Sequence, residues 1–206
     1  LAPVSVPNPS EPPFSENCQV KSILKESTNF ENFALSEKYG VVSAADSNGI
    51  YQIYVGPREN GTSSVKQDKL KCISCSPISG GPRVDRHKMM PTIHPSGDWI
   101  VVGIEEDVHD NSWMPMSWQL GFLQSGIWLN IWITNSTGEK WFQITDFRPS
   151  NGPSNGFVGT PFTPDGKTVV WAEIVDGNIF VNKFGIWKLF SADFVVGTDG
   201  VPGFTN

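Results

Sequence analysis

A phrase that occurs three times constrains this chain more than any other feature of its sequence. Each copy joins a short apolar run to a β-branched or aromatic run through a polar turn. The clearest copy is HKMMPTIHPSGDWIVV at 87–102, and the phrase returns as VGTPFTPDGKTVVW at 158–171. A less regular copy, NFALSEKYGVVSA, occupies 32–44. Proline presets φ at the second turn position and glycine suits the last, so the phrase predicts strand, tight turn and strand.

Two further β-prone runs follow each copy, so each repeat predicts a four-stranded antiparallel meander. No segment has a sustained 3.6-residue apolar period, and we therefore expect little helix. The last ten residues, GTDGVPGFTN, predict an exposed loop. The predicted strands are 31–36, 40–44, 51–55 and 69–75 in the first repeat, 90–93, 99–104, 129–134 and 140–145 in the second, and 159–163, 168–174, 185–190 and a fourth that begins near Phe194 in the third.

Serial four-stranded antiparallel units predict an all-β fold, a β-propeller with about three blades. A propeller closes with four to eight blades, so three blades form an incomplete ring with exposed sheet edges. We expect a Pro-rich lead-in at 1–29 and a partial propeller at 30–206, with blades at about 30–76, 87–147 and 156–196. The expected partner is a second chain, a missing C-terminal segment or a symmetry-related copy that completes the ring.

Charge and composition exclude several classes of partner. The formal net charge is −6 and no basic run occurs, which argues against nucleic acid and anionic membrane surfaces. No apolar run approaches the roughly 20 residues of a membrane span. The chain starts at Leu1, so we expect a processed, secreted protein. Asn60-Gly61-Thr62 and Asn135-Ser136-Thr137 are predicted N-glycosylation sites, at Asn60 and Asn135.

The three cysteines are Cys18, Cys72 and Cys75. The CxxC spacing of Cys72 and Cys75 is also found in zinc and redox sites. Zinc requires a second ligand pair and a redox motif requires a βαβ setting, and neither is present. We favour one structural disulfide, either between Cys72 and Cys75 or from Cys18 to one of this pair.

The phrases TIHPSGDWIVV and PFTPDGKTVVW, followed by NIWIT or GIWKL strands and by WFQIT, resemble the WD40-like repeats of TolB-type propellers. The resemblance covers about residues 30–196. It implies a fold and no particular function, because such propellers serve both as enzyme domains and as binding platforms. A second phrase, KLKCISCSP at 69–77, is similar to one in secreted fungal saponin hydrolases, which cleave a sugar from triterpenoid glycosides. Neither resemblance assigns a catalytic residue here.

Strand order predicts which connections share an end of the fold. First–second and third–fourth connections, with both glycosylation sites, lie at one end, and the remaining connections lie at the other. The connection 105–128 is more than twenty residues long, and long loops on a rigid scaffold are often functional. It combines carboxylates, an imidazole and indoles, which suit acid–base chemistry and stacking on a sugar. The candidate catalytic residues are Glu105, Asp107, His109 and Glu173, and the candidate substrate-binding residues are Arg86, His87, Trp113 and Trp118.

The resulting hypothesis is a glycosidase-like hydrolase that uses two carboxyl groups and no cofactor. The spacing of the acidic residues and His109 matches no defined metal site, so no metal is expected. Two alternatives remain: a non-catalytic propeller that binds a glycan or a protein, and a structural assembly subunit. The same residues also suit a solvated acidic loop that its Trp and Met side chains pack down.

Overall fold

The computed structural model describes residues 30–59, 65–105, 129–146, 157–158, 161–175 and 186–205. Within these ranges the chain forms three antiparallel sheets of four strands each, and the sheets do not close into a barrel. The only helical element there is the short 3-10 turn η1, Gln67–Lys69. The predicted all-β fold of propeller-like, four-stranded units is therefore confirmed.

In each sheet the strands follow chain order and neighbours are antiparallel. The first sheet contains β1 (Phe30–Leu35), β2 (Tyr39–Ala45), β3 (Tyr51–Pro57) and β4 (Lys71–Cys72). The second contains β5 (Lys88–Ile93), β6 (Trp99–Glu105), β7 (Leu129–Asn135) and β8 (Trp141–Gln143). The third contains β9 (Phe157–Val158), β10 (Thr168–Val175), β11 (Ile186–Val196) and β12 (Pro202–Thr205).

The last two strands of the third sheet differ from the prediction. β11 continues through Phe194 to Val196, so the prediction of a fourth strand that begins near Phe194 is wrong. The chain turns between Gly197 and Val201, where the Gly197 amide donates to the Val201 carbonyl, and β12 follows. The predicted exposed terminal loop is therefore partly a strand. Pairing of Phe204 with Phe194 supports this strand, and no property of the local sequence reveals that pairing.

The turn that the repeated phrase predicts between the first two strands of a sheet is confirmed in the second and third sheets. The Gly97 amide donates to the His94 carbonyl, and the Gly166 amide donates to the Thr163 carbonyl, each at 2.8 Å. Both glycines have φ in the left-handed region, 82° and 73°, which an L side chain rarely adopts. The turn residues therefore fix where β6 and β10 begin.

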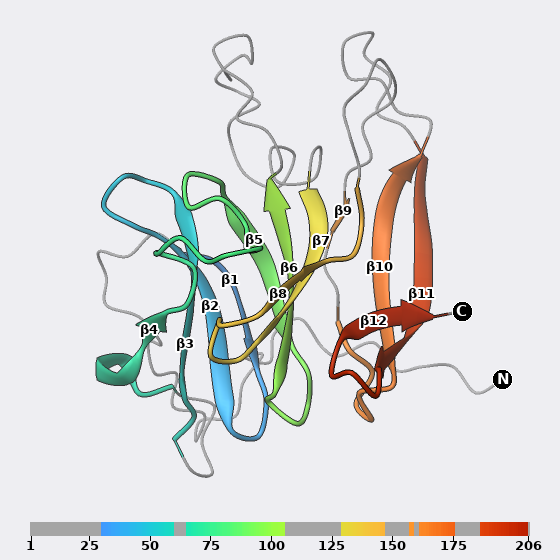
Figure 1. The fold of residues 1–206 in the computed structure, drawn as a ribbon, viewed down its shortest axis with the longest axis horizontal. Coiled ribbons are helices and arrows are strands. Elements are labelled where there is room, and N and C mark those ends of the chain that lie inside the picture. The colour runs from blue at the N-terminus through green and yellow to red at the C-terminus, as the bar shows by residue number, and fades with distance from the viewer. Residues whose placement is uncertain are drawn as a thin grey trace, which may run out of the picture.

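The first two sheets pack face to face around one apolar cluster. Ile53 and Val55 of the first sheet meet Ile100, Val102 and other side chains of the second. Figure 1 shows the three sheets side by side, with the second between the other two. The second sheet therefore buries both of its faces, as a middle blade does.

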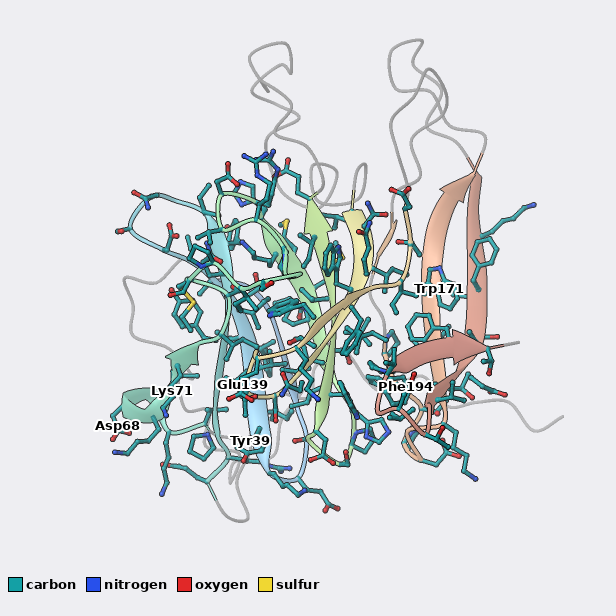
Figure 2. All side chains as sticks on the ribbon, viewed as in Figure 1. Tyr39, Asp68, Lys71, Glu139, Trp171 and Phe194 are labelled. Carbon is teal, nitrogen blue, oxygen red and sulfur yellow. A yellow bond between two sulfur atoms is a disulfide. The ribbon has the colours of Figure 1, made fainter. Side chains whose placement is uncertain are left out.

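A second cluster joins the second sheet to the third. Ile131 and Ile133 pack with Trp171 and Phe194, which Figure 2 labels on the third sheet. The imidazole of His94 adds a polar connection, because its Nε2 lies 3.2 Å from the Gly166 carbonyl oxygen. Aromatic side chains on this face of the third sheet thus fill the space between the sheets.

One disulfide joins Cys72 to Cys75. Of the two pairings that the sequence left open, the local one is therefore observed. The intervening residues point into the first two sheets: Ile73 belongs to their shared apolar cluster, and the Ser74 hydroxyl accepts a hydrogen bond from the Ile53 amide. The bridge thus closes a tight loop whose buried side chains help to join the sheets.

Among the described residues, no helix is long and apolar enough to cross a membrane.

Candidate functional site

The connections of the fold separate into two ends. At one end the Ser136 amide, after β7, donates to the Asp98 carbonyl before β6, which brings a third–fourth connection beside a first–second connection. At the opposite end, the upper one in Figure 1, lie the connection from β2 to β3 and the chain just before β5. This division agrees with the one that strand order predicts.

His87 lies at this upper end and contacts residues of both the first and the second sheet. Its Nδ1 accepts a hydrogen bond of 3.2 Å from the Tyr51 amide, so a neutral imidazole carries its proton on Nε2. The ring centroids of Tyr51 and His87 are 5.6 Å apart. His87 therefore links the first sheet to the connection between β4 and β5, residues 73–87, which is called the crossover below.

Glu105 lies beside His87 at the end of β6. The Glu105 amide donates to the His87 carbonyl at 3.0 Å, and the Glu105 Oε2 lies 3.5 Å from the His87 amide nitrogen. Two of the residues that the sequence predicted for the site are thus neighbours. Glu105 is half-buried.

Asp85 brings a second carboxylate to this end. Two hydrogen bonds reach it from Arg83, Nε to Oδ1 at 3.0 Å and Nη2 to Oδ2 at 2.7 Å. The Arg86 Nη1 lies 3.2 Å from the same Oδ2. The hydrogen bonds from Arg83 and the charge of Arg86 hold the pKa of Asp85 below its usual range against the opposing effect of desolvation. Asp85 is therefore ionised at neutral pH.

Arg86, a predicted substrate-binding residue, is buried and forms an ion pair with Asp85, and its role toward a substrate stays a prediction. Its side chain is only 6% exposed, whereas that of Asp85 is 57% exposed. Arg86 can thus act on a ligand through the position and charge of Asp85, and direct contact needs movement of the crossover.

Asp46 is a third carboxylate at this end, and its role is structural. Burial raises its pKa, but hydrogen bonds from the amides of Asn48 and Ile50 and from the Gln52 side chain lower it more, and the net shift is downward. Gln52 in turn donates to the Val84 carbonyl at 2.9 Å and accepts from the Ser74 hydroxyl at 2.8 Å. This buried network fixes the crossover on the first sheet.

Several predicted site residues are not tested. Asp107, His109, Trp113, Trp118 and Asn60 lie outside the described residues. The main chain of Glu173 pairs with Lys188 and Phe157 in the third sheet, whereas Glu105 belongs to the second. Within the described ranges, no group of three His, Cys, Asp or Glu side chains has a geometry that would hold a metal ion.

Asn135 lies in the tight turn between β7 and β8, at the end opposite His87. Its Nδ2 donates to the Thr137 hydroxyl at 2.7 Å, and its Oδ1 accepts from the Lys140 amide. The sequence-based placement of this glycosylation motif away from the candidate site agrees with the structure.

Sequence reasoning missed Tyr51 and Lys88. Tyr51 is 36 residues from His87 in the chain, and only sheet packing brings them together. Lys88 had a usable signal: it alternates with Met90 and shares the buried side of the strand. The side chains of Tyr51, Asp85, His87 and Glu105 are called the crossover cluster below.

No family model and no curated protein matches this chain. Solved structures do match it. An endo-1,4-β-xylanase of Bacteroides thetaiotaomicron is 12% identical, with 95% of this chain and 64% of that chain covered and a TM-score of 0.50. An α-L-arabinofuranosidase of Lactobacillus brevis is 12% identical, with 91% and 58% covered and a TM-score of 0.46. TolB of Acinetobacter baumannii is 14% identical, with 89% and 34% covered and a TM-score of 0.46.

The chain thus spans between 34% and 64% of the length of these structures. At such identities a likeness concerns the fold alone. The three stacked four-stranded sheets themselves define the class of this part of the chain, a set of propeller-like blades.

Proposed function

We propose that the chain is a three-blade portion of a secreted, TolB-like β-propeller that hydrolyses glycosidic bonds in a glycosylated substrate. The observation that carries this proposal is the crossover cluster. It combines two carboxyl groups, an imidazole and a phenol ring at the end where the longest connection, 105–128, also begins. The endo-1,4-β-xylanase that shares this fold acts on a substrate of the same class.

The two carboxyl groups of the crossover cluster take different roles in the proposal. The lowered pKa of Asp85 keeps it ionised, as a base or nucleophile must be. In the proposal Glu105, which lies beside His87 at the end of β6, takes the role of general acid. Tyr51 and His87 present rings on which a sugar can stack, and Trp113 and Trp118 of the long connection extend this platform in the proposal.

Single variants test these roles. Asp85→Asn and Glu105→Gln should each lower kcat/KM by about a hundredfold or more, as loss of acid–base catalysis does. The substrates are a panel of aryl glycosides and triterpenoid glycosides. Asp98→Asn, at the opposite end of the fold, is the matched control and should leave turnover unchanged. Full activity in both site variants, with thermal stability retained, would remove the cluster from the mechanism.

A non-catalytic glycan-binding propeller is the second candidate. The bidentate hydrogen bonding of Arg83 to Asp85 favours this candidate, because a carboxylate fixed in that way can accept hydrogen bonds from sugar hydroxyls. Titration calorimetry with the same glycosides separates the candidates. Heat of binding without product release supports binding, and release of free sugar supports hydrolysis.

We also propose that a further four-stranded sheet covers the outward face of the third sheet. Equivalent register positions carry Ile53 opposite Ser43, Ile131 opposite Gly103 and Leu189 opposite Ala172. Ile53 and Ile131 are fully buried by the next sheet, whereas Leu189 is 75% exposed. Ile131 packs against aromatic side chains of the next sheet, and Leu189 at the equivalent position suits packing against a similar aromatic-rich face.

A second copy of this chain is a poorer fit than a different sheet. Closure by a second copy would use the outward face of its first sheet. A Cβ at Gly40 or Gly56 on that face would collide with Val65, so the connection after β3 already fills this part of the face. Native and denaturing mass spectrometry tests the proposal: a native particle of 22.7 kDa plus glycans would overturn it.

Secretion is proposed from the disulfide and the glycosylation motif at Asn135. Expression in a eukaryotic secretory host should give a glycan at Asn135 that Thr137→Ala abolishes, read as a mass difference after glycosidase treatment. An unmodified Asn135 in secreted protein would contradict the glycosylation.

A further inference from the structure

Lys88 is fully buried at the start of β5, yet every hydrogen of its ammonium group has an acceptor. Its Nζ donates to the main-chain carbonyls of Arg83 at 2.8 Å, Val84 at 2.9 Å and Arg86 at 2.7 Å. An ammonium group has three donors and no acceptor, so these bonds satisfy it completely. Carbonyl oxygens that converge in this way form a cage like those that bind free cations.

The cage belongs to the segment that carries the crossover cluster. Its three carbonyls come from residues 83–86, which include Asp85, and His87 follows immediately. The Val84 carbonyl also accepts from Gln52, and the Lys88 carbonyl accepts from the Ser43 hydroxyl at 2.7 Å. The main chain of Lys88 is thus bonded directly to the first sheet, and its side chain is connected to that sheet through Val84 and Gln52.

The charges around the cage explain why it holds an ammonium group. Burial lowers the pKa of Lys88 to about 8, while Asp85, Asp46 and Glu105 oppose this effect and Arg86 adds to it. The group is therefore mostly protonated at pH 7 and offers all three hydrogens. A neutral side chain would remove this donor from all three carbonyls and leave the Val84 carbonyl with Gln52 alone, which is costly.

We propose that Lys88 is a positioning residue: its ammonium group acts as a tethered cation that shapes residues 83–86 and thereby sets the place of His87 and Asp85 in the crossover cluster. An effect of Lys88 on substrate binding rests on the proposed glycan site. Its effect on the position of His87 does not, because that position can be measured without a ligand.

The Tyr51 amide reports that position. It donates to His87 Nδ1, so its hydrogen exchange depends on where the crossover lies. Lys88→Met keeps an unbranched side chain, one heavy atom shorter, and removes the charge and the N–H donors. At pH 7 it should speed exchange of the Tyr51 amide by about tenfold or more. The Ile144 amide, bonded to the Ile131 carbonyl in the second sheet, is the internal control. Lys167→Met, at an exposed lysine, is the matched variant.

Chemical rescue separates this role from simple packing. In Lys88→Ala the missing atoms correspond to n-propylammonium. Added n-propylammonium should restore slow exchange at Tyr51, whereas tetramethylammonium, which has no N–H donor, should not. Restoration by both cations, or by neither, would overturn the proposal.

Wild-type protein provides a measurement if the variants do not fold. The ¹⁵N resonance of the Lys88 ammonium should be visible at pH 7 with slow hydrogen exchange, and rapid exchange would overturn the proposal. Glycoside binding by the wild-type protein is measured separately. Fast exchange of the Tyr51 amide in Lys88→Met supports the positioning role whether or not wild type binds a glycoside. Absence of glycoside binding by wild type counts against the proposed function alone. Unchanged Tyr51 exchange in a folded variant overturns the positioning role.

Discussion

At the scale of single residues, His94 shows how a turn side chain joins two sheets. Its Nε2 lies 3.2 Å from the Gly166 carbonyl oxygen, and its ring contacts Phe162 and Phe194 with centroids 5.0 and 5.3 Å away. Nδ1 accepts from the Ser96 amide, so Nε2 is the donor to Gly166. His94 is the residue of the second sheet that bonds to the turn of the third.

His94→Ala should therefore lower the free energy of unfolding by about 2 kcal/mol, because it removes a hydrogen bond and ring packing together. Denaturant titration measures this change. Asp98→Asn breaks only the exposed ion pair with Lys38 and should cost less than about 0.5 kcal/mol. Equal effects of the two changes would show that His94 does not join the sheets.

Lys88 gives the stability a defined dependence on pH. Burial lowers its pKa to about 8 in the folded protein, whereas an unfolded lysine titrates near 10.4. Between these values the unfolded chain binds more protons, so the contribution of Lys88 makes the free energy of unfolding rise with pH, by at most about 3 kcal/mol. Denaturant titrations at pH 7 to 10 should show this rise in wild type relative to Lys88→Met. Parallel curves would contradict it.

At the scale of elements, the disulfide acts on the end of β4. The bridge from Cys72 to Cys75 holds Ile73 and Ser74 in the buried side of the first sheet. In the chain-entropy account, a cross-link across a loop this short lowers the conformational entropy of the unfolded chain and so stabilises the folded state by about 2 kcal/mol. The bridge therefore stabilises the contact between the first two sheets as well as its own loop.

Reduction should lower the midpoint of denaturant unfolding by an amount that corresponds to about 2 kcal/mol. The double variant Cys72→Ser, Cys75→Ser should unfold at that lower midpoint with or without reductant. A variant as stable as oxidised wild type would show that the loop keeps its shape without the bridge.

At the scale of the whole molecule, the outward face of the third sheet decides whether these three sheets act alone. Ile131 and Leu189 occupy equivalent register positions, with 0% and 75% of the residue exposed. Ile131→Ala should cost about 2–5 kcal/mol, and Leu189→Ala in the isolated chain less than about 0.5 kcal/mol. In a native particle with a further sheet, the cost of Leu189→Ala should rise towards that of Ile131→Ala. An unchanged, small cost there would leave the face without a partner.

Repetition made most of the fold predictable. The turns at 94–97 and 163–166 follow from proline and glycine chemistry within four residues, and the strands that come after them, β6 and β10, follow from apolar, β-branched composition. β12 was missed because its support comes from the pairing of Phe204 with Phe194 across a turn. Local patterns carry no information on a pairing of that kind.

The candidate site was less predictable than the fold. The neighbouring positions of Glu105 and His87 follow from strand order alone, and the structure brings them together. Burial of Arg86 and its ion pair with Asp85 did not follow, because the path of the crossover depends on Gln52 in another part of the chain. Charge identity is local, whereas burial depends on packing.

By itself, the sequence determined the four-stranded repeat, its turns and the end at which connections with carboxyl groups gather, because each depends on residues close in the chain. Only the tertiary structure decided which side chains meet at that end. Tyr51 reaches His87, and Lys88 fills a cage of carbonyls, because two sheets pack against one crossover. Contacts between distant segments depend on packing geometry, and no short stretch of sequence encodes that geometry.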